Sequence, residues 1–145
     1  MPIRKPDNSL RLCVDYRKVN SVTKPENFPM PRLLDSIYAG SNIKFFSKMD
    51  LTKGYYQMPI NEDSRDITSF STAHNQYRFK RLSFGLRNSG IAFQRIMQDI
   101  LADYCFKNII VYIDDILLMT ETFEEHLDLL QKVLSTLGEN GIKII

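Results

Sequence analysis

The sequence predicts an α+β fold. Strand-like and helix-like segments are mixed along the 145 residues without the strict strand–helix–strand order of a parallel sheet. Two C-terminal stretches have apolar residues at helical spacing, whereas other stretches alternate or form short apolar runs. Hydrophobic residues make up 43% and charged residues 25% of the chain, so we expect a packed core and not a disordered segment.

The N-terminal part predicts one strand and one short helix. Residues 1–9 are polar and contain proline, which indicates a loop or a sheet edge. Leu10 to Arg17 alternates between apolar and polar side chains and predicts a half-buried strand. Residues 18–31 hold three prolines and predict an extended crossing segment. Residues 33–38 have helical spacing, and Gly40 would end that helix.

The middle of the chain predicts a strand and a hairpin. Phe45–Leu51 indicates a strand, followed by a turn at residues 52–54. Ile67–Ser71 and Tyr77–Leu82 indicate the two arms of a hairpin. The hairpin turn contains His74-Asn75, and asparagine tolerates the left-handed conformation that such turns need.

Two helices are predicted in the C-terminal part. The first covers residues 89–104 and would be capped by Asn88 or Ser89. Its expected buried stripe consists of Ala92, Phe93, Ile96, Met97, Ile100, Leu101 and Tyr104. The second covers residues 122–138, opens with a Thr122-x-x-Glu125 capping box and ends at Gly138 or Gly141. Its expected buried stripe consists of Phe123, Leu127, Leu130, Val133, Leu134 and Leu137.

Composition argues against several classes of protein. No apolar run of 18 residues predicts a membrane span, and the start of the chain lacks an apolar signal core. Cys13 and Cys105 lie far apart, so neither a disulfide framework nor a zinc site is expected. We therefore expect an intracellular, cytoplasmic protein without a membrane partner.

The net charge of +2 conceals an asymmetry. Residues 1–98 carry 16 basic and 8 acidic side chains, whereas residues 99–145 carry 3 basic and 9 acidic ones. A polyanion is the expected partner of the basic part, and cations are the expected partners of the acidic part. Two solvated faces are the alternative.

The strongest chemical signal is a pair of acids inside an apolar run. Asn108–Met119 is interrupted only by Asp114-Asp115, and turning the run there makes a hairpin with both acids at its tip. Two carboxylates held close together repel, and Mg²⁺ or Mn²⁺ is a usual counterion for such oxygen ligands. Asp50 ends another apolar strand. If the two strands are neighbours, three carboxylates could hold two metal ions about 4 Å apart, the arrangement used for phosphoryl transfer. A solvated turn is the alternative.

Five motifs resemble those of reverse transcriptases, in the same order and at compatible spacing. They are Val14–Asn20, Phe46–Gln57, Phe84–Asn88, Phe93-Gln94 and Tyr112–Asp115. The sequence is most similar to the polymerases of gypsy-type long-terminal-repeat retrotransposons, over nearly the whole chain. The resemblance implies the fingers and palm of a right-hand polymerase, with an antiparallel palm sheet backed by helices. It also implies RNA-directed DNA synthesis by nucleotidyl transfer.

Four residues match the family's metal site. Asp50 and Asp114 match the principal metal-bridging carboxylates, and Asp115 matches the third, less direct one. The backbone of Leu51 lies in the stretch that approaches the metal and the triphosphate. The implied cofactor is a pair of Mg²⁺ ions, for which Mn²⁺ could substitute.

Further residues match positions that bind the nucleotide, the template or the primer. The residues that match nucleotide-binding positions are Arg4, Lys5, Arg11, Tyr55, Phe84 and Gly85. Arg4 or Lys5 would meet the triphosphate, and Arg11 would lie over the base. Tyr55 would stack under the sugar as a steric gate against a 2′-hydroxyl, and core packing is its alternative role. Those for template and primer are Gln94, Tyr112 and Ile113.

The implied partners are an RNA or DNA template with its primer, deoxynucleoside triphosphates and the rest of a Pol polyprotein. Residues 1–145 would be a partial domain of fingers and palm, and thumb, ribonuclease H and integrase would belong to the remainder. Ser83 and Gly90 replace prolines that are usual in the family, which loosens a loop and a helix start. A degenerate, non-catalytic relic that still binds nucleic acid is therefore one alternative, and a viral RNA-dependent RNA polymerase is another.

Overall fold

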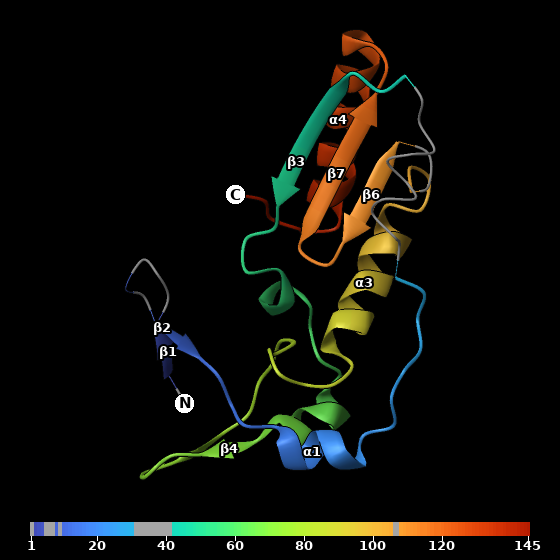
Figure 1. Cartoon of the computed structure of the whole chain (residues 1–145). Helices are drawn as coiled ribbons and strands as arrows, with labels where there is room; N and C mark the ends of the chain where they lie inside the picture. Colours follow the sequence, from blue (N-terminus) through green and yellow to red (C-terminus); the bar gives the residue numbers. More distant parts are fainter. Residues whose placement is uncertain (1, 5–7, 9, 31–41, 106–107) are drawn as a thin grey trace. The chain divides into compact units, whose positions relative to one another are not determined.

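The computed structural model describes residues 2–4, 8, 10–30, 42–105 and 108–145, and it confirms the α+β class (Figure 1). The chain forms two compact units. Unit 1 consists of Met1–Glu26 and Tyr55–Ser89, and unit 2 of Asn27–Gly54 and Gly90–Ile145. Each unit therefore combines two separate stretches of the sequence. No helix within the described residues is long and apolar enough to cross a membrane.

Unit 2 is built on a three-stranded antiparallel sheet in the order β3–β7–β6 (Figure 1). Its strands are β3 (Phe45–Asp50), β6 (Ile109–Tyr112) and β7 (Asp115–Thr120). The central strand β7 pairs with β3 along its whole length, from Phe45 opposite Thr120 to Asp50 opposite Asp115. β3 alternates between half-buried and exposed residues, as expected for a strand with one face on the core.

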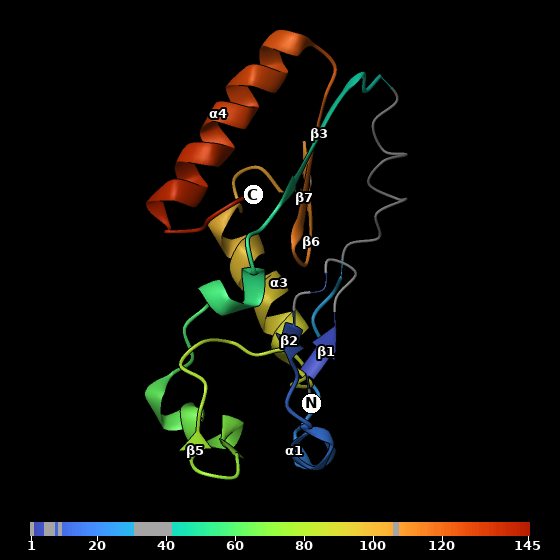
Figure 2. The ribbon, with the colours of Figure 1, turned by 90° about the vertical axis from the view of Figure 1, so that its left-hand side faces the viewer.

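The described residues of unit 2 include two helices, α3 (Ser89–Ile100) and α4 (Phe123–Glu139). Figure 2 shows α4 along one face of the sheet, where it contacts β3 and β7. The capping box is confirmed, because Thr122 Oγ1 accepts from the Glu125 amide while Glu125 Oε2 accepts from the Thr122 amide. The core comprises Phe93, Met97, Leu101, Ile109, Val111, Ile116, Leu118, Val133 and Leu137, all at most 2% exposed.

A buried histidine joins α4 to the sheet. His126 lies 2.7 Å from Ser47 Oγ through Nε2 and 2.9 Å from Thr120 Oγ1 through Nδ1. Ser47 belongs to β3 and Thr120 to β7, so one imidazole ties both strands to the helix. The polar groups of this histidine are satisfied inside the unit, as burial requires.

Unit 1 consists of short elements. Two small antiparallel sheets pair β1 (Pro2–Arg4) with β2 (Leu10–Leu12) and β4 (Phe70–Ser71) with β5 (Gln76–Tyr77). The remaining elements are α1 (Arg17–Val22) and the 3-10 helices η1 (Gly54–Gln57) and η2 (Glu62–Thr68). Side-chain hydrogen bonds connect these short pieces.

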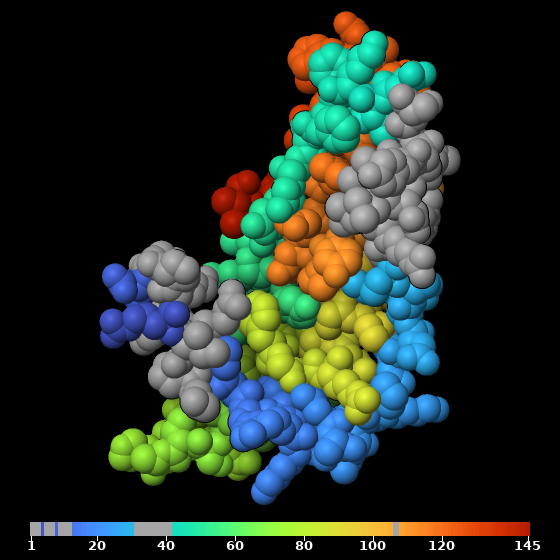
Figure 3. Space-filling model, viewed as in Figure 1, coloured from blue at the N-terminus to red at the C-terminus, as the bar shows by residue number. Residues whose placement is uncertain are grey.

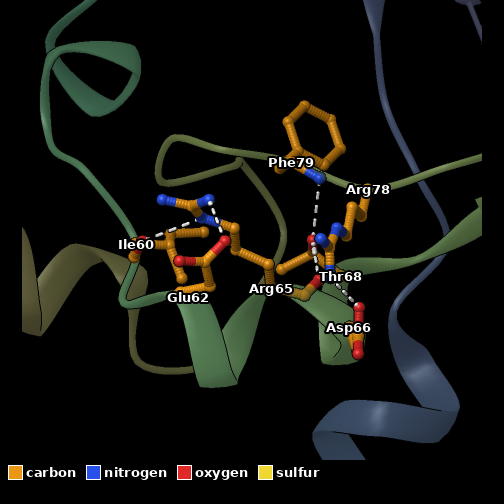
Figure 4. A network of polar contacts seen from close by, with 7 residues as sticks. All are labelled: Ile60, Glu62, Arg65, Asp66, Thr68, Arg78 and Phe79. Atoms are coloured by element: carbon orange, nitrogen blue, oxygen red, sulfur yellow. Dashed lines mark hydrogen bonds and ion pairs between the residues drawn. The ribbon is translucent and has the colours of Figure 1, made fainter.

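Figure 4 shows the polar network around η2. Arg65 Nε donates to the Ile60 carbonyl at 3.2 Å, and Arg65 Nη1 pairs with Glu62. The buried Thr68 hydroxyl donates to the Arg65 carbonyl and accepts from the Phe79 amide at 2.9 Å. Arg78 pairs with Asp66 at the end of the network. The network therefore fixes Arg78 and Phe79, which follow the hairpin, to η2.

Several predicted boundaries are wrong. The strand predicted for Leu10–Arg17 ends at Leu12, and α1 begins at Arg17. The buried Tyr16 donates its hydroxyl to the Thr68 carbonyl at 3.0 Å, and the Asn20 side chain bonds the Gly85 carbonyl and the Arg87 amide. These distant contacts favour a helix at Arg17–Val22, so the extended segment predicted for residues 18–31 is wrong at its start. The helix predicted for residues 33–38 lies outside the described residues.

The hairpin and helix predictions are confirmed in position but not in extent. Ile67 belongs to η2, and residues 78–82 are not in a named strand. Asn88 uses its side chain to bond the Lys24 carbonyl and the Glu26 amide instead of capping α3, and Ser89 Oγ donates to the Ser83 carbonyl. Four residues of the two predicted buried stripes are exposed instead: Ile96, Phe123, Leu127 and Leu134.

Candidate active site

Two of the predicted catalytic acids face each other across the sheet. Asp50 ends β3 and pairs in register with Asp115, the first residue of β7. Tyr112 ends β6 and pairs with Asp115 from the other side. Paired residues of an antiparallel sheet point to the same face. Tyr112, Asp115 and Asp50 therefore form one row across the end of the sheet.

Asp114 lies in the turn beside this row. The two-residue turn of the β6–β7 hairpin is Ile113-Asp114, one residue earlier than the predicted turn at Asp114-Asp115. Asp115 is therefore a strand residue, while Asp114 is at the tip. The Leu51 amide donates to the Asp114 carbonyl at 3.1 Å, and this bond ties the end of β3 to the hairpin. The approach of the Leu51 backbone to a metal ion or a triphosphate stays a prediction.

The Asp114 carboxyl packs against Gly54. Its Oδ1 atom is buried, and a Cβ added to Gly54 would stand 2.2 Å from it. The same Cβ would be 3.0 Å from Cζ of Phe93 in α3. A glycine is therefore required here by space, because any side chain would displace the carboxyl group. The sequence marks Gly54 only as part of a turn.

Lys48 is a site residue that sequence reasoning missed. Its ammonium nitrogen lies 3.0 Å from Asp115 Oδ1, and both side chains are partly exposed. The alternation of β3 places Lys48 on the same face as Asp50, two residues away. That spacing was the available signal. The ion pair partly offsets the negative charge that the aspartates bring to this end of the sheet.

The three acids do not form a ready-made metal centre. Among the residues that the structure describes, no group of three or more His, Cys, Asp or Glu side chains could hold a metal ion. The donor chemistry nevertheless fits a hard divalent cation, because aspartate and backbone oxygens are the atoms that this sheet end offers. The close packing of Asp114 on Gly54 also fits a carboxylate held in one place.

Part of this sheet lies at the molecular surface. Figure 3 shows atoms of β3, in teal, beside those of the β6–β7 hairpin, in orange, at the surface. Tyr112 is 42% exposed, so its ring is available for contact with another molecule. This agrees with the predicted role of Tyr112 and leaves that role a prediction.

Gln94 does not lie where the predicted template contact requires. Its side chain is 0% exposed. Gln94 Nε2 donates to the Val111 carbonyl, and its Oε1 accepts from the Ile113 amide, both at 2.7 Å. A buried amide whose hydrogen bonds go to the hairpin backbone is not available to a template. The prediction of a direct contact for Gln94 is therefore wrong.

Ile113 has an unusual backbone conformation. Its φ is +53°, in the left-handed region that β-branched residues rarely adopt. A positive φ at the first central residue belongs to a hairpin turn that normally uses glycine there. Such a conformation costs on the order of 1–3 kcal/mol and persists only where surrounding contacts impose it.

Three of the predicted nucleotide-binding residues come together within unit 1. The ring centroids of Tyr55 and Phe84 are 4.7 Å apart, and Tyr56 meets Phe84 edge-on at 5.4 Å. Gly85 follows with a φ of +91°, which a larger residue would adopt only under strain. Tyr56 also stacks on Phe79 at 6.2 Å. Tyr56 thus packs against two aromatic rings of unit 1.

The structure describes only part of the predicted phosphate-binding residues. Arg4 is exposed in β1. Lys5 lies outside the described residues, and for Arg11 the structure describes the backbone of β2 alone. Their roles stay predictions.

Ser83, one of the departures from the family pattern, is built into unit 1. It is 1% exposed, and its hydroxyl lies 3.5 Å from that of Tyr16. Burial raises the pKa of Tyr16, which favours the protonated hydroxyl that donates to Thr68. The Ser83 carbonyl accepts from Ser89. Ser83 is therefore a buried, hydrogen-bonded residue of unit 1.

Comparison with known proteins places the chain among polymerases. Residues 3–145 match the family model described as "Reverse transcriptase (RNA-dependent DNA polymerase)". The chain is 36% identical over 145 residues to the "Retrovirus-related Pol polyprotein from transposon 297" of Drosophila melanogaster, covering 97% of the chain and 14% of the polyprotein. It is 37% identical over 134 residues to that from transposon gypsy of the same fly, covering 92% and 13%.

Solved structures give the same result. A foamy viral protease–reverse transcriptase in complex with double-stranded DNA matches with a TM-score of 0.84 and 35% identity, over 99% of this chain and 25% of that one. The same kind of enzyme in complex with an RNA/DNA hybrid matches with a TM-score of 0.82 and 36% identity, over 95% and 18%. The chain thus spans a quarter or less of the length of these relatives.

Proposed function

The chain belongs to the reverse transcriptase family, and from this premise we propose that it carries the nucleotidyl-transfer site of an RNA-directed DNA polymerase. The polymerase would be part of a retrotransposon Pol polyprotein with thumb, ribonuclease H and integrase. The similarity to Pol polyproteins of gypsy-type transposons supports this context.

One observation carries the proposal: the sheet register that pairs Asp50 with Asp115 and places Asp114 in the adjoining turn. Three carboxylates from two distant stretches of sequence meet at one end of a sheet. Acids on a solvated surface would need neither this register nor a glycine at position 54 that leaves room for the Asp114 carboxyl group.

Asp50 and Asp114, with the carbonyl oxygen of Leu51, would hold Mg²⁺, and Asp115 would act less directly. Mn²⁺ would substitute, because both ions prefer oxygen ligands. When bound, two such ions supply activation of the primer hydroxyl and neutralisation of the leaving pyrophosphate. The contribution of the chain is positioning: the β3–β7 pairing sets the spacing of the acids, and Lys48 orients Asp115.

The proposed substrates are deoxynucleoside triphosphates and a primed RNA or DNA template. The structural relatives in complex with DNA and with an RNA/DNA hybrid support the nucleic-acid partner. Arg4, Lys5 and Arg11 would meet the triphosphate and base. The Tyr55–Phe84 pair would form the floor of the sugar site.

The test replaces Asp114 by asparagine in the full-length polymerase that carries this chain. Asp114→Asn keeps the shape beside Gly54 but removes the charge, so primer extension in Mg²⁺ should fall at least about a thousandfold, to background. Asp128→Asn is the matched control, because Asp128 lies exposed on α4 in an ion pair with Lys132 and should leave extension unchanged. Undiminished synthesis by Asp114→Asn would sink the proposal.

A non-catalytic relic that keeps the fold is the remaining alternative. Ser83 is buried and its hydroxyl contacts that of Tyr16, which argues against a loss of structure at this departure from the family pattern. Calorimetric titration with Mn²⁺ followed by primer extension separates the two cases. Binding of Mn²⁺ without any extension would identify a relic.

A further inference from the structure

Gln94 is the fully buried polar side chain of α3. Its neighbours Phe93 and Met97 on the helix are equally buried, so Gln94 sits in an apolar environment. Placing an amide there is costly unless both of its ends are hydrogen-bonded. Both ends are satisfied, and both by backbone groups of the β6–β7 hairpin.

The two bonds bracket the hairpin turn. One goes to the Val111 carbonyl in β6, and the other comes from the amide of Ile113, the residue with a φ of +53°. A planar amide that meets both groups at 2.7 Å holds the backbone between them in one arrangement. Asp114 follows Ile113 directly, so the conformation at Ile113 sets the direction from which Asp114 leaves the backbone.

We propose that Gln94 is a positioning residue that holds Ile113 in its left-handed conformation and thereby fixes the Asp114 carboxylate against Gly54. Gln94 itself touches neither substrate nor metal. The inference rests on the proposed function, because the placement of Asp114 affects catalysis only if Asp114 takes part in nucleotidyl transfer. It also explains why a glutamine occupies an otherwise apolar helix face.

The first test measures the hairpin directly and needs no variant. A turn residue at the end of a sheet would ordinarily exchange its amide hydrogen quickly. In the full-length polymerase, the Ile113 amide should instead exchange slowly, because Gln94 Oε1 accepts from it. Fast exchange at Ile113 would contradict the inference.

The second test replaces Gln94 by methionine, which has a similar length and no hydrogen-bonding groups. Loss of such a supporting contact typically costs about 10- to 100-fold in activity or metal affinity. Gln94→Met should therefore lower kcat by that factor, raise the Mn²⁺ concentration needed for half-saturation and leave the KM for nucleotide nearly unchanged. Met97→Ala is the matched control: it opens a cavity on the same helix but keeps the Gln94 amide, and should leave Mn²⁺ half-saturation unchanged.

The third test separates positioning from packing by a double-mutant cycle. Ile113→Gly removes the conformational penalty at the turn, because glycine adopts a positive φ freely. Gln94→Met should then cost clearly less kcat in the Ile113→Gly background than in the native one. Equal losses in both backgrounds would reduce Gln94 to a packing residue and overturn the inference.

The outcomes also distinguish the two proposals. If Asp114→Asn abolishes extension while Gln94→Met behaves as the unsubstituted enzyme, the inference fails and the proposed function stands. If Asp114→Asn retains full extension, the proposed function fails. Slow exchange at Ile113 and its acceleration by Gln94→Met would still measure the hairpin contact.

Discussion

Single residues decide how the three proposed catalytic acids are positioned. Asp50 and Asp115 are placed by the sheet register, but Asp114 depends on what lies beside it. Gly54 leaves room for the carboxyl group, and Gln94 bonds the backbone that carries it. The acids were visible in the sequence as charges within apolar runs, whereas their supports are ordinary residues in unremarkable local patterns.

Tyr55 gives a prediction at the same scale. Tyr55→Val removes the ring that packs on Phe84, so ribonucleotides should be rejected less well, by on the order of 10- to 100-fold, the effect of one added group in a pocket. The measurement is the ratio of kcat/KM for matched deoxy- and ribonucleotides in the full-length polymerase.

Two variants serve as controls for Tyr55. Tyr55→Phe keeps the ring and should retain the discrimination. Tyr56→Val removes the ring that stacks on Phe79, so it should weaken the packing of unit 1 without changing sugar choice. Unchanged sugar selectivity in Tyr55→Val would remove Tyr55 as the gate.

At the scale of elements, neighbouring residues explain where α4 begins, whereas they do not explain where the β6–β7 hairpin turns. The capping box of α4 involves residues three apart, so its prediction needed nothing beyond the sequence. The hairpin turn lies at Ile113-Asp114, although isoleucine is a poor residue for a positive φ. A tertiary contact from α3 outweighs the local preference there.

Thr122 gives a prediction for α4. Thr122→Ala removes the acceptor for the Glu125 amide and should destabilise the first turn by about 1 kcal/mol. Hydrogen exchange of the first-turn amides should become roughly fivefold faster. Thr136→Ala is the control, because Thr136 lies half-buried in the same helix, far from its first turn, and its hydroxyl bonds the Lys132 carbonyl. Equal effects of the two substitutions would contradict a capping role.

At the scale of the whole molecule, the distribution of charge along the sequence agrees with the proposed roles of its two parts. The basic side chains are concentrated in residues 1–98, and two of the three proposed metal-binding acids lie in the acidic remainder. A basic surface that binds a nucleic acid releases counterions, so its affinity falls with salt. The acids serve local geometry and contribute little to this long-range attraction.

Binding of a primed template by the full-length polymerase should therefore weaken steeply with salt. Lys80 is exposed within the basic part, and Lys80→Ala should reduce the slope of log affinity against log salt by about 1. Lys132→Ala should leave the slope unchanged, because Lys132 lies in the acidic part and pairs with Asp128. Equal slopes for both variants and the native protein would exclude Lys80 from the contact.

The sequence by itself determined the α+β class, the family and the identity of the three acids. Those features depend on residue type and spacing. The capping box at Thr122 and the acids inside apolar runs are examples. The tertiary structure alone decided the register that pairs Asp50 with Asp115, the turn at Ile113 and the buried role of Gln94. The same holds for α1, which forms at Arg17–Val22, mostly where proline content predicted an extended crossing segment. The physical reason is that these features depend on hydrogen bonds and packing between residues far apart in the chain, where local propensity carries no information.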